Sequence, residues 1–232
     1  MTVELGHATT IATSCSEASA LLAWHTVDRR AAFRLRYEVY IAEQRKPYPE
    51  ANHEDRILTD ELDAEGEIVI VKDKGEVLGT VRTNSLASPL AHAKYCEVLG
   101  IQELPDMNLS RSVVSSRLAT NAGHRRAVVR SMLFEKIYEH QLTRGTRHCF
   151  AVCAPPLVRM FRRYGFREYA MPIHDAIAGT LHRTLLVLDD LDHLRGIHSP
   201  FVAIAEKLGV AATPDSQLNQ LFQNYKGCHA NF

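Results

Sequence analysis

The succession of helix-like and strand-like segments constrains the fold of this chain more than any other feature of its sequence. Apolar residues recur with helical spacing in some segments, and β-branched and apolar residues cluster in short runs in others. The patterns predict a helix at 28–44, a hairpin at 67–84, a strand at 108–116 and a helix at 125–144. They then predict a strand at 147–154, a short helix at 156–164 and two strands at 166–171 and 180–190. This order predicts an α/β fold, with a mixed β-sheet flanked by helices.

The sequence shows no linker that would divide the chain into two large domains. We therefore expect one main domain over residues 28–209. Residues 1–27, which begin with a stretch rich in small and polar residues, are predicted to form an irregular N-terminal arm. Residues 210–232 are predicted to form a helical tail that packs on the domain or extends from it.

Charge and composition argue against several functional classes. Lys+Arg and Asp+Glu number 27 each, so no overall basic field favours a nucleic acid partner. No apolar run approaches the ~20 residues needed to cross a bilayer, so we expect no stable membrane insertion. The N-terminus lacks the pattern of a signal peptide, and the five cysteines are too irregular for a disulfide framework, so a cytoplasmic location is expected. The histidines are scattered, and we predict no metal site.

An arginine stands inside a segment that reads as a strand, "NLSRSVV". A guanidinium in a strand needs a partner, because leaving it unpaired costs a large desolvation free energy. The segments "RLRYEVY", "DELD", "GTVRTNS" and "NLSRSVV" resemble those of LuxI-type acyl-homoserine lactone synthases, and this resemblance implies that Asp60 or Asp63 pairs with Arg111, with Arg36 and Arg82 nearby. Two roles remain open for this predicted cluster. It could be a purely structural network of ion pairs, or it could shape an amine pocket and hold a substrate carboxylate through one arginine.

A strand, a basic turn, a long helix, a strand and a short helix ending in "RRYGF" together resemble the GCN5-related N-acetyltransferase fold. The resemblance implies that a central strand splays from its neighbour and that the pantetheine arm of an acyl thioester lies in the gap. It also implies that the start of the long helix binds the phosphate. The residues that would bind phosphopantetheine or a carrier protein are His124, Arg125, Arg126, Ala127 and Arg130.

Two departures from that fold family point to a narrower group. The turn "HRRAVV" lacks the glycines that fit a diphosphate, and its arginines suit the single phosphate of an acidic acyl carrier protein. Phe161 stands where many acetyltransferases have a tyrosine that protonates the leaving thiolate. The segments "RLRYEVY", "DELD", "GTVRTNS" and "NLSRSVV" resemble LuxI-type acyl-homoserine lactone synthases, although Asn108 replaces their glutamate.

The segments "RYEVY", "VLGTVRTN", "CAPPLVRMFRRYGFREY" and "SPFVAIAEKLG" are closer to the FeeM-like N-acyl amino acid synthase family, and this resemblance covers residues 28–209. It implies transfer of a long-chain acyl group from an acyl carrier protein thioester to the amine of an amino acid. The acyl-phosphopantetheine thioester would be a co-substrate, and no tightly bound cofactor is expected. The alternatives are a lactone synthase using S-adenosylmethionine, a coenzyme A-dependent acetyltransferase, and a non-catalytic acyl-binding module.

Several residues are candidates for this chemistry. Direct attack by the amine needs no protein nucleophile, but backbone N–H groups near the strand arginine would stabilise the oxyanion. The catalytic candidates are Arg111, the backbone of Ser112, Val113 and Val114, and two possible bases, Glu97 and Glu103. The substrate-binding candidates beyond the charged cluster are Glu43, Phe150, Cys153 and Phe161. For each candidate a structural interpretation stays open. The glutamates fit solvated surface residues, and Cys153 fits a packed thiol rather than a nucleophile. The aromatic residues fit ordinary core positions.

Overall fold

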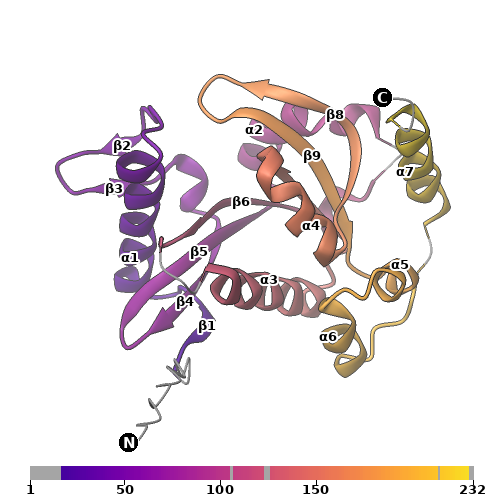
Figure 1. Cartoon of the computed structure of the whole chain (residues 1–232), viewed down its shortest axis with the longest axis horizontal. Helices are drawn as coiled ribbons and strands as arrows, with labels where there is room; N and C mark the ends of the chain where they lie inside the picture. The colour runs from indigo at the N-terminus through magenta and orange to yellow at the C-terminus, as the bar shows by residue number, and fades with distance from the viewer. Residues whose placement is uncertain (1–16, 105–106, 123–125, 214, 230–232) are drawn as a thin grey trace, which may run out of the picture.

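A seven-stranded β-sheet runs through the molecule, with helices on both of its faces (Figure 1). The structure is a computed structural model that describes residues 17–104, 107–122, 126–213 and 215–229. The strand order is β1-β4-β5-β6-β7-β9-β8, and the strands are β1 (Ser19–Leu22), β4 (Glu67–Asp73), β5 (Glu76–Ser85), β6 (Ser112–Thr120), β7 (His148–Cys153), β8 (Arg167–Asp175) and β9 (Gly179–Val187). Every neighbouring pair is antiparallel except β6 and β7, which are parallel.

The helices are α1 (Thr26–Tyr37), α2 (Pro89–Leu99), α3 (Arg126–Thr143), α4 (Val158–Tyr164), α5 (Leu191–Gly196), α6 (Phe201–Lys207) and α7 (Ser216–His229). A π-helical turn, η1 (Glu38–Glu43), continues α1, and a small ribbon of β2 (Ala51–Asn52) and β3 (Ile57–Leu58) follows. The described residues also contain four 3-10 turns: η2 (Glu61–Asp63), η3 (Ile101–Glu103), η4 (Leu109–Arg111) and η5 (Pro155–Leu157).

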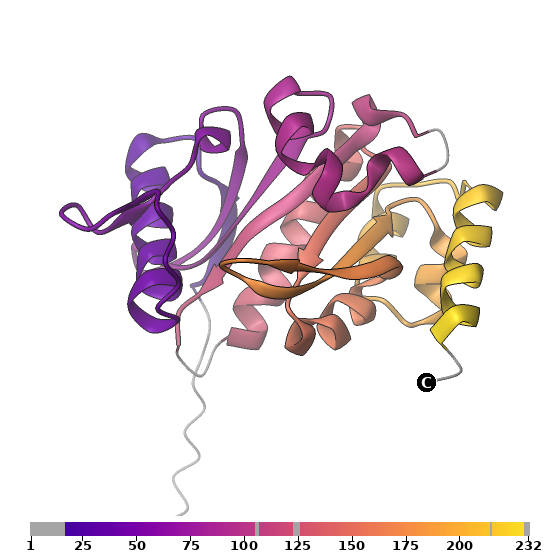
Figure 2. The same cartoon turned by 90° about the horizontal axis from the view of Figure 1, so that it is seen from above.

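The alternation of side chains along each strand explains why helices cover both faces of the sheet. In β4, Ile68 and Ile70 belong to the cluster formed with α1, whereas Val69 and Val71 pack in the cluster that contains Val129 of α3. Since successive side chains in a strand point to opposite faces, an unbroken apolar run is buried from both sides. Helices α1, α2 and α7 therefore lie on one face, and α3 to α6 lie on the other (Figure 2).

Strands β6 and β7 diverge after a short stretch of pairing. Their register runs from Ser112 opposite His148 to Ser115 opposite Ala151, and then ends. β6 continues to Thr120 without a β7 partner. The α/β fold with a mixed sheet and splayed central strands, as predicted from the sequence, is confirmed.

Two segments differ from their predicted structure. Ser19–Leu22, inside the predicted irregular arm 1–27, form the edge strand β1 and pair with β4. The predicted strand 108–116 begins later, at Ser112, because the Asn108 side chain accepts from the Ser110 N–H and caps the turn η4 instead. Arg111 therefore ends a turn rather than standing inside a strand.

The predicted C-terminal tail 210–232 contains α7, which packs on the sheet. Leu218 and Phe222 belong to the same core cluster as Tyr169 of β8. The guanidinium carbon of Arg167 lies 3.8 Å from the centre of the Phe222 ring. Among the residues that the structure describes, no helix is both long and apolar enough to span a membrane.

Candidate active site

A cavity of about 610 Å³ opens where β6 and β7 diverge. Its inner part lies under α3 and is mostly apolar, with buried walls formed by Leu133, Phe134, Ile137, Tyr138, Leu186, Leu188 and Phe201. Its outer part is polar and is lined by Tyr40, Lys46, Tyr48, Glu50, Asp60, Lys94, Tyr95, Arg117 and Asp175. The cavity thus joins a charged mouth to an apolar interior.

A β-bulge in β6 shapes the mouth. Thr80 of β5 pairs with Ala119, but the next pair joins Arg82 to Ser116, so Arg117 and Leu118 together face a single residue of β5. Arg117 has a φ of 56°, a left-handed conformation that non-glycine residues rarely adopt. Leu118 is held by the Tyr40 hydroxyl, which donates to its carbonyl oxygen at 2.7 Å.

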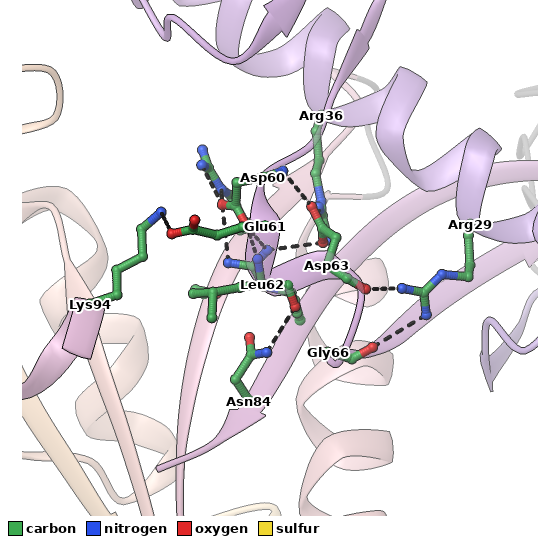
Figure 3. Close-up of polar contacts among 12 residues, drawn as sticks. Arg29, Arg36, Asp60, Glu61, Leu62, Asp63, Gly66, Asn84 and Lys94 are labelled. Atoms are coloured by element: carbon green, nitrogen blue, oxygen red, sulfur yellow. Dashed lines mark hydrogen bonds and ion pairs between the residues drawn. The ribbon is translucent and has the colours of Figure 1, made fainter. Parts of the chain in front are cut away.

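A chain of five charged side chains lies beneath this bulge (Figure 3). Arg36 of α1 donates to Asp63 at 2.7 Å, and Asp63 lies 3.0 Å from Arg82 of β5. Arg82 also donates to Asp60, whose other oxygen accepts from Arg117 at 2.7 Å. The side chains of Arg36 and Arg82 have no exposed surface, and that of Asp60 is 2% exposed, so this is a buried network.

Local features of the chain hold the two carboxylates in place. Asp60 and Asp63 form a capping box around η2, each side chain accepting a backbone N–H of that turn. Arg29 donates to the carbonyl oxygens of Asp63 and Gly66. Gly66 is needed for close approach, because a Cβ there would lie 2.6 Å from Cδ of Arg82.

The network fixes the protonation state of Asp60. Burial by itself raises the pKa of Asp60, but hydrogen bonds and charge from Arg82 and Arg117 outweigh it and hold the pKa well below its usual range. Asp60 is therefore ionised at neutral pH and is a poor proton acceptor. Three guanidinium groups face two carboxylates, so the buried network has an excess of positive charge.

The predicted cluster is largely present, but one member is different. Arg36, Asp60, Asp63 and Arg82 meet as expected, whereas Arg111 is exposed and donates to the Gly145 carbonyl oxygen at 2.8 Å. Arg117 takes the expected place of Arg111. The sequence analysis missed it because the predicted strand ended at residue 116, and because a bulge leaves no mark in the alternation of residue types.

The oxyanion and base candidates also need correction. Ser112, Val113 and Val114 lie where β6 has neighbours on both sides, β5 and β7, so their backbone groups belong to the sheet. The edge of β6 that faces the cleft begins only after Ser115. The three candidate glutamates are exposed and do not line the cavity: Glu43, Glu97 and Glu103. The carboxylates that line it are Glu50, Asp60 and Asp175.

The predicted apolar lining is correct in part. Cys153 and Phe161 line the cavity, together with Val152 and Leu157. Phe150 does not, because it alternates with Cys149 and Ala151 along β7 and packs against Tyr169 on the other face of the sheet.

The predicted phosphate-binding turn is described only in part. His124 and Arg125 lie outside the described residues. Arg126 is the first residue of α3, Ala127 is exposed in the first turn and Arg130 is half-buried one turn later. Among the described residues, no group of three or more His, Cys, Asp or Glu side chains is arranged to hold a metal ion.

Replacing Cys153 by alanine is expected to leave acyl transfer nearly unchanged. Burial and the nearby Glu168 carboxylate raise the pKa of the Cys153 thiol to about 12, so little thiolate exists at neutral pH. Steady-state rates of the variant and the parent enzyme, both checked for folding by circular dichroism, measure this. Complete loss of turnover in a folded C153A protein would instead identify an acyl-cysteine intermediate.

The chain is similar to known proteins in sequence and in fold. The family model described as N-acyl amino acid synthase FeeM matches residues 31–185 of the chain. No curated protein matches the sequence.

Many solved structures share the fold, and three of them are FeeM, TofI and BjaI. The structure of FeeM, an N-acyl amino acid synthase from uncultured soil microbes, has 13% identity and a TM-score of 0.57, covering 81% of this chain and 99% of that one. TofI, in a ternary complex with an inhibitor and MTA, has 19% identity and a TM-score of 0.61, covering 81% and 99%. BjaI with MTA, a CoA-dependent acyl-homoserine lactone synthase, has 15% identity and a TM-score of 0.61, covering 82% and 97%. At these identities the likeness establishes the fold alone.

Proposed function

The chain belongs to the N-acyl amino acid synthase FeeM family, and from this premise we propose that it moves a long-chain acyl group from an acyl carrier protein thioester to the amine of an amino acid. Membership of the family makes it an N-acyltransferase. The observation that carries the finer proposal is the cavity, which leads from a charged mouth at the β6–β7 cleft to an apolar interior under α3.

The inner cavity suits an acyl chain. Its walls are aliphatic and aromatic, so an acyl chain inside it leaves water without giving up hydrogen bonds. Gln141 is the polar side chain at the inner wall, and its hydrogen bonds go to Glu67, Thr83 and Thr146. Because its polar atoms are already bonded within the protein, Gln141 does not oppose an apolar ligand.

Exposed arginines beside the cleft support a carrier protein as the donor. Pro156 and Leu157 line the cavity, and α4 begins immediately after them. Arg159 and Arg163 are four residues apart on α4 and exposed, so they share one face. Such a face complements the acidic surface of an acyl carrier protein. The proposed setting is the cytoplasm, the location expected from the cysteine pattern.

Exchanging Arg159 and Arg163 for glutamate is expected to reduce kcat/KM for an acyl carrier protein donor by about tenfold or more, because two attractive contacts become repulsive. The same variant should use a short acyl-pantetheine donor, which lacks the carrier protein, as well as the parent does. Rates with both donors at low ionic strength test this. An equal loss with both donors would show that α4 does not bind the carrier.

The mouth presents charges of both signs to an amino acid. Burial lowers the pKa of Lys46, and the Asp175 carboxylate counteracts this, so the two groups lie within electrostatic reach of each other. The Lys46 ammonium lies 5.5 Å from the centre of the Tyr40 ring and has no ion pair among the described residues. We assign the substrate carboxylate to Lys46 and the substrate ammonium to Asp175.

The reaction then needs few protein groups. The ammonium loses a proton to solvent at the mouth, and the neutral amine attacks the thioester carbonyl. Backbone N–H groups of β6 after Ser115, where the strand has no β7 partner, stabilise the oxyanion. The C–N bond forms, the attacking nitrogen gives up its second proton to solvent, the C–S bond breaks, and the leaving thiolate takes up a proton from solvent.

Changing Lys46 to methionine is expected to raise KM for the acceptor amino acid about tenfold or more, with a smaller change in kcat, since a charge-assisted hydrogen bond is lost in binding. Lys74→Met, which changes an exposed lysine in the β4–β5 turn, serves as the matched control. The measurement is a titration of amino acid at saturating acyl donor. An unchanged KM in the K46M variant would place the carboxylate elsewhere.

Mass spectrometry of lipid extracts tests the function as a whole. Bacteria expressing the chain should accumulate compounds whose mass equals a fatty acid plus one amino acid minus water, and an empty-vector strain should not. Acyl-homoserine lactones in their place would reassign the acceptor. A folded protein without any new lipid would contradict the proposed activity.

A further inference from the structure

A second pocket, of about 300 Å³, lies at the opposite end of β6 and β7 from the cavity mouth. The mouth lies beyond the C-terminal ends of these parallel strands, whereas the second pocket lies at their beginning, between η4, β7 and the start of α7. Its lining includes Met107, Arg111, Arg147, His148, Asp215 and Leu218. The proposed acyl transfer uses none of these residues.

One of its two arginines is available to a ligand. Arg111 donates through Nε to the Gly145 carbonyl oxygen, and its two terminal nitrogens make no hydrogen bond or ion pair with the described residues. Arg147 is occupied, since it lies 3.3 Å from Asp189 and donates to the Thr213 carbonyl oxygen at 3.0 Å. The free terminal edge of Arg111 is the geometry that binds a carboxylate through two hydrogen bonds.

His148 lines the same pocket and, within the described part of the chain, has an acceptor without a partner. The residue is 4% exposed, and its Nε2 has no hydrogen-bond partner among the described residues. The Ser112 hydroxyl donates its proton to the Asn108 carbonyl oxygen, so its oxygen accepts from Nδ1–H of His148 at 3.2 Å. Nε2 is then unprotonated and can accept a hydrogen bond. A buried acceptor of this kind needs a donor.

The protonation state of the His148 imidazole agrees with this assignment. Burial, with the charges of Arg147 and Arg111, lowers the pKa of His148 to about 4, although Asp215 acts in the opposite direction. The imidazole is therefore neutral at pH 7. A ligand at this place must bring a donor to Nε2 and an anionic group to Arg111.

The Asp215 carboxylate in the pocket wall favours some ligand charges over others. Asp215 accepts from the Leu218 N–H through Oδ1, while its Oδ2 lies 3.6 Å from Arg147. A simple anion would be repelled by this carboxylate, whereas a cationic group beside it would be attracted. Arg111, Asp215 and His148 line one pocket, and together they match a molecule that carries both charges.

We infer that this pocket binds a small zwitterion with the chemistry of a free α-amino acid. Its carboxylate binds the terminal edge of Arg111, and its ammonium donates to His148 Nε2 and Asp215. Met107 and Leu218 contact its side chain. The site is separate from the acceptor position at Lys46, and its existence does not depend on the proposed acyl transfer.

The test reads the ring nitrogens of His148 directly by NMR. The protein is labelled with ¹⁵N-histidine and carries Lys46→Met, so that binding at the cavity mouth is weakened. The probes are individual α-amino acids, acetate, methylammonium and inorganic phosphate. The ring signals of His148 are assigned by comparison with His148→Gln. We expect at least one amino acid to shift His148 Nε2 with saturation, and the three single-charge probes to leave it unchanged.

Two variants locate the ligand groups. Arg111→Met, which changes an exposed side chain, should weaken amino acid binding at least about tenfold by removing the carboxylate partner. Asp215→Asn, which preserves a helix-capping residue, should weaken it by removing the negative charge. Arg144→Met is the matched control, since this neighbouring arginine is exposed but outside the pocket, and it should bind like the parent.

Three results would overturn the inference. Phosphate or acetate shifting His148 as strongly as any amino acid would make the pocket a simple anion site. Failure of every amino acid to shift His148 would remove the site. Equal affinity in the Arg111→Met protein would place the ligand elsewhere. Each of these can occur whether or not the enzyme makes N-acyl amino acids, so the failure of one proposal is distinguishable from failure of the other.

Discussion

Replacing Asp60 by asparagine is expected to lower the free energy of unfolding by about 3–5 kcal/mol, the range measured when one partner of a buried ion pair is removed. Asp60 bridges Arg82 and Arg117, and its side chain is 2% exposed. The network already holds more guanidinium groups than carboxylates. Without this carboxylate, Arg82 keeps Asp63 as its ion-pair partner, and Arg117 loses its ion pair with Asp60.

Urea denaturation of the parent and the D60N variant measures this difference. Asp55→Asn is the matched control: it breaks an aspartate–arginine pair of similar geometry in which both side chains are about half exposed, and should cost less than about 1 kcal/mol. If D60N and D55N unfold at the same urea concentration, the network contributes little to stability. Retained stability with lost turnover would assign it to the amine pocket, the second role that the sequence left open.

Replacing Cys149 by phenylalanine is expected to reduce kcat/KM for long-chain donors by about 100-fold, the loss that a displaced reacting group produces, while a short-chain donor is still used. Cys149 lines the cavity beside Ser115, where β6 and β7 begin to separate. A benzyl side chain there occupies the space that an acyl chain needs. The measurement is the rate as a function of donor chain length.

Measurements of stability distinguish a filled cavity from a disrupted fold. Because the new ring enters an existing cavity, C149F should unfold near the parent's temperature. Ala151→Phe is the matched control, since Ala151 lies on the same face of β7 and is buried, but does not line the cavity. That variant should lose about 1–3 kcal/mol or more from overpacking. Equal loss of stability in both variants, or unchanged chain-length preference in C149F, would contradict an acyl tunnel at this place.

The charged network and the second pocket together answer why an arginine precedes "SVV". Arg111 does not support the catalytic cleft, because the network at the cleft is completed by Arg117. Arg111 stands just before the first residue of β6, whereas Arg117 lies at the bulge inside β6, beyond its pairing with β7. A substitution at Arg111 therefore probes the second pocket, whereas one at Arg117 probes the cavity mouth.

Much of the architecture follows from local patterns in the sequence. Period-two and helical spacings predict the β4–β5 hairpin, α3 between β6 and β7, and the mixed sheet, since these patterns reflect which faces are buried. The resemblance of their segments to LuxI-type synthases also predicted four members of the buried network: Arg36, Asp60, Asp63 and Arg82.

Only the tertiary structure decided which arginine completes the network and where the cavity lies. The bulge at Arg117 reverses the expected alternation; the Tyr40 hydroxyl donates to the carbonyl oxygen of the next residue, Leu118, and Asp60 accepts from the Arg117 side chain. The cleft exists because β6 and β7 part after four paired residues, and the residue types along the two strands do not mark where this pairing ends. Residue types along a chain specify which faces are apolar, but the distances between elements follow from packing across the whole sheet.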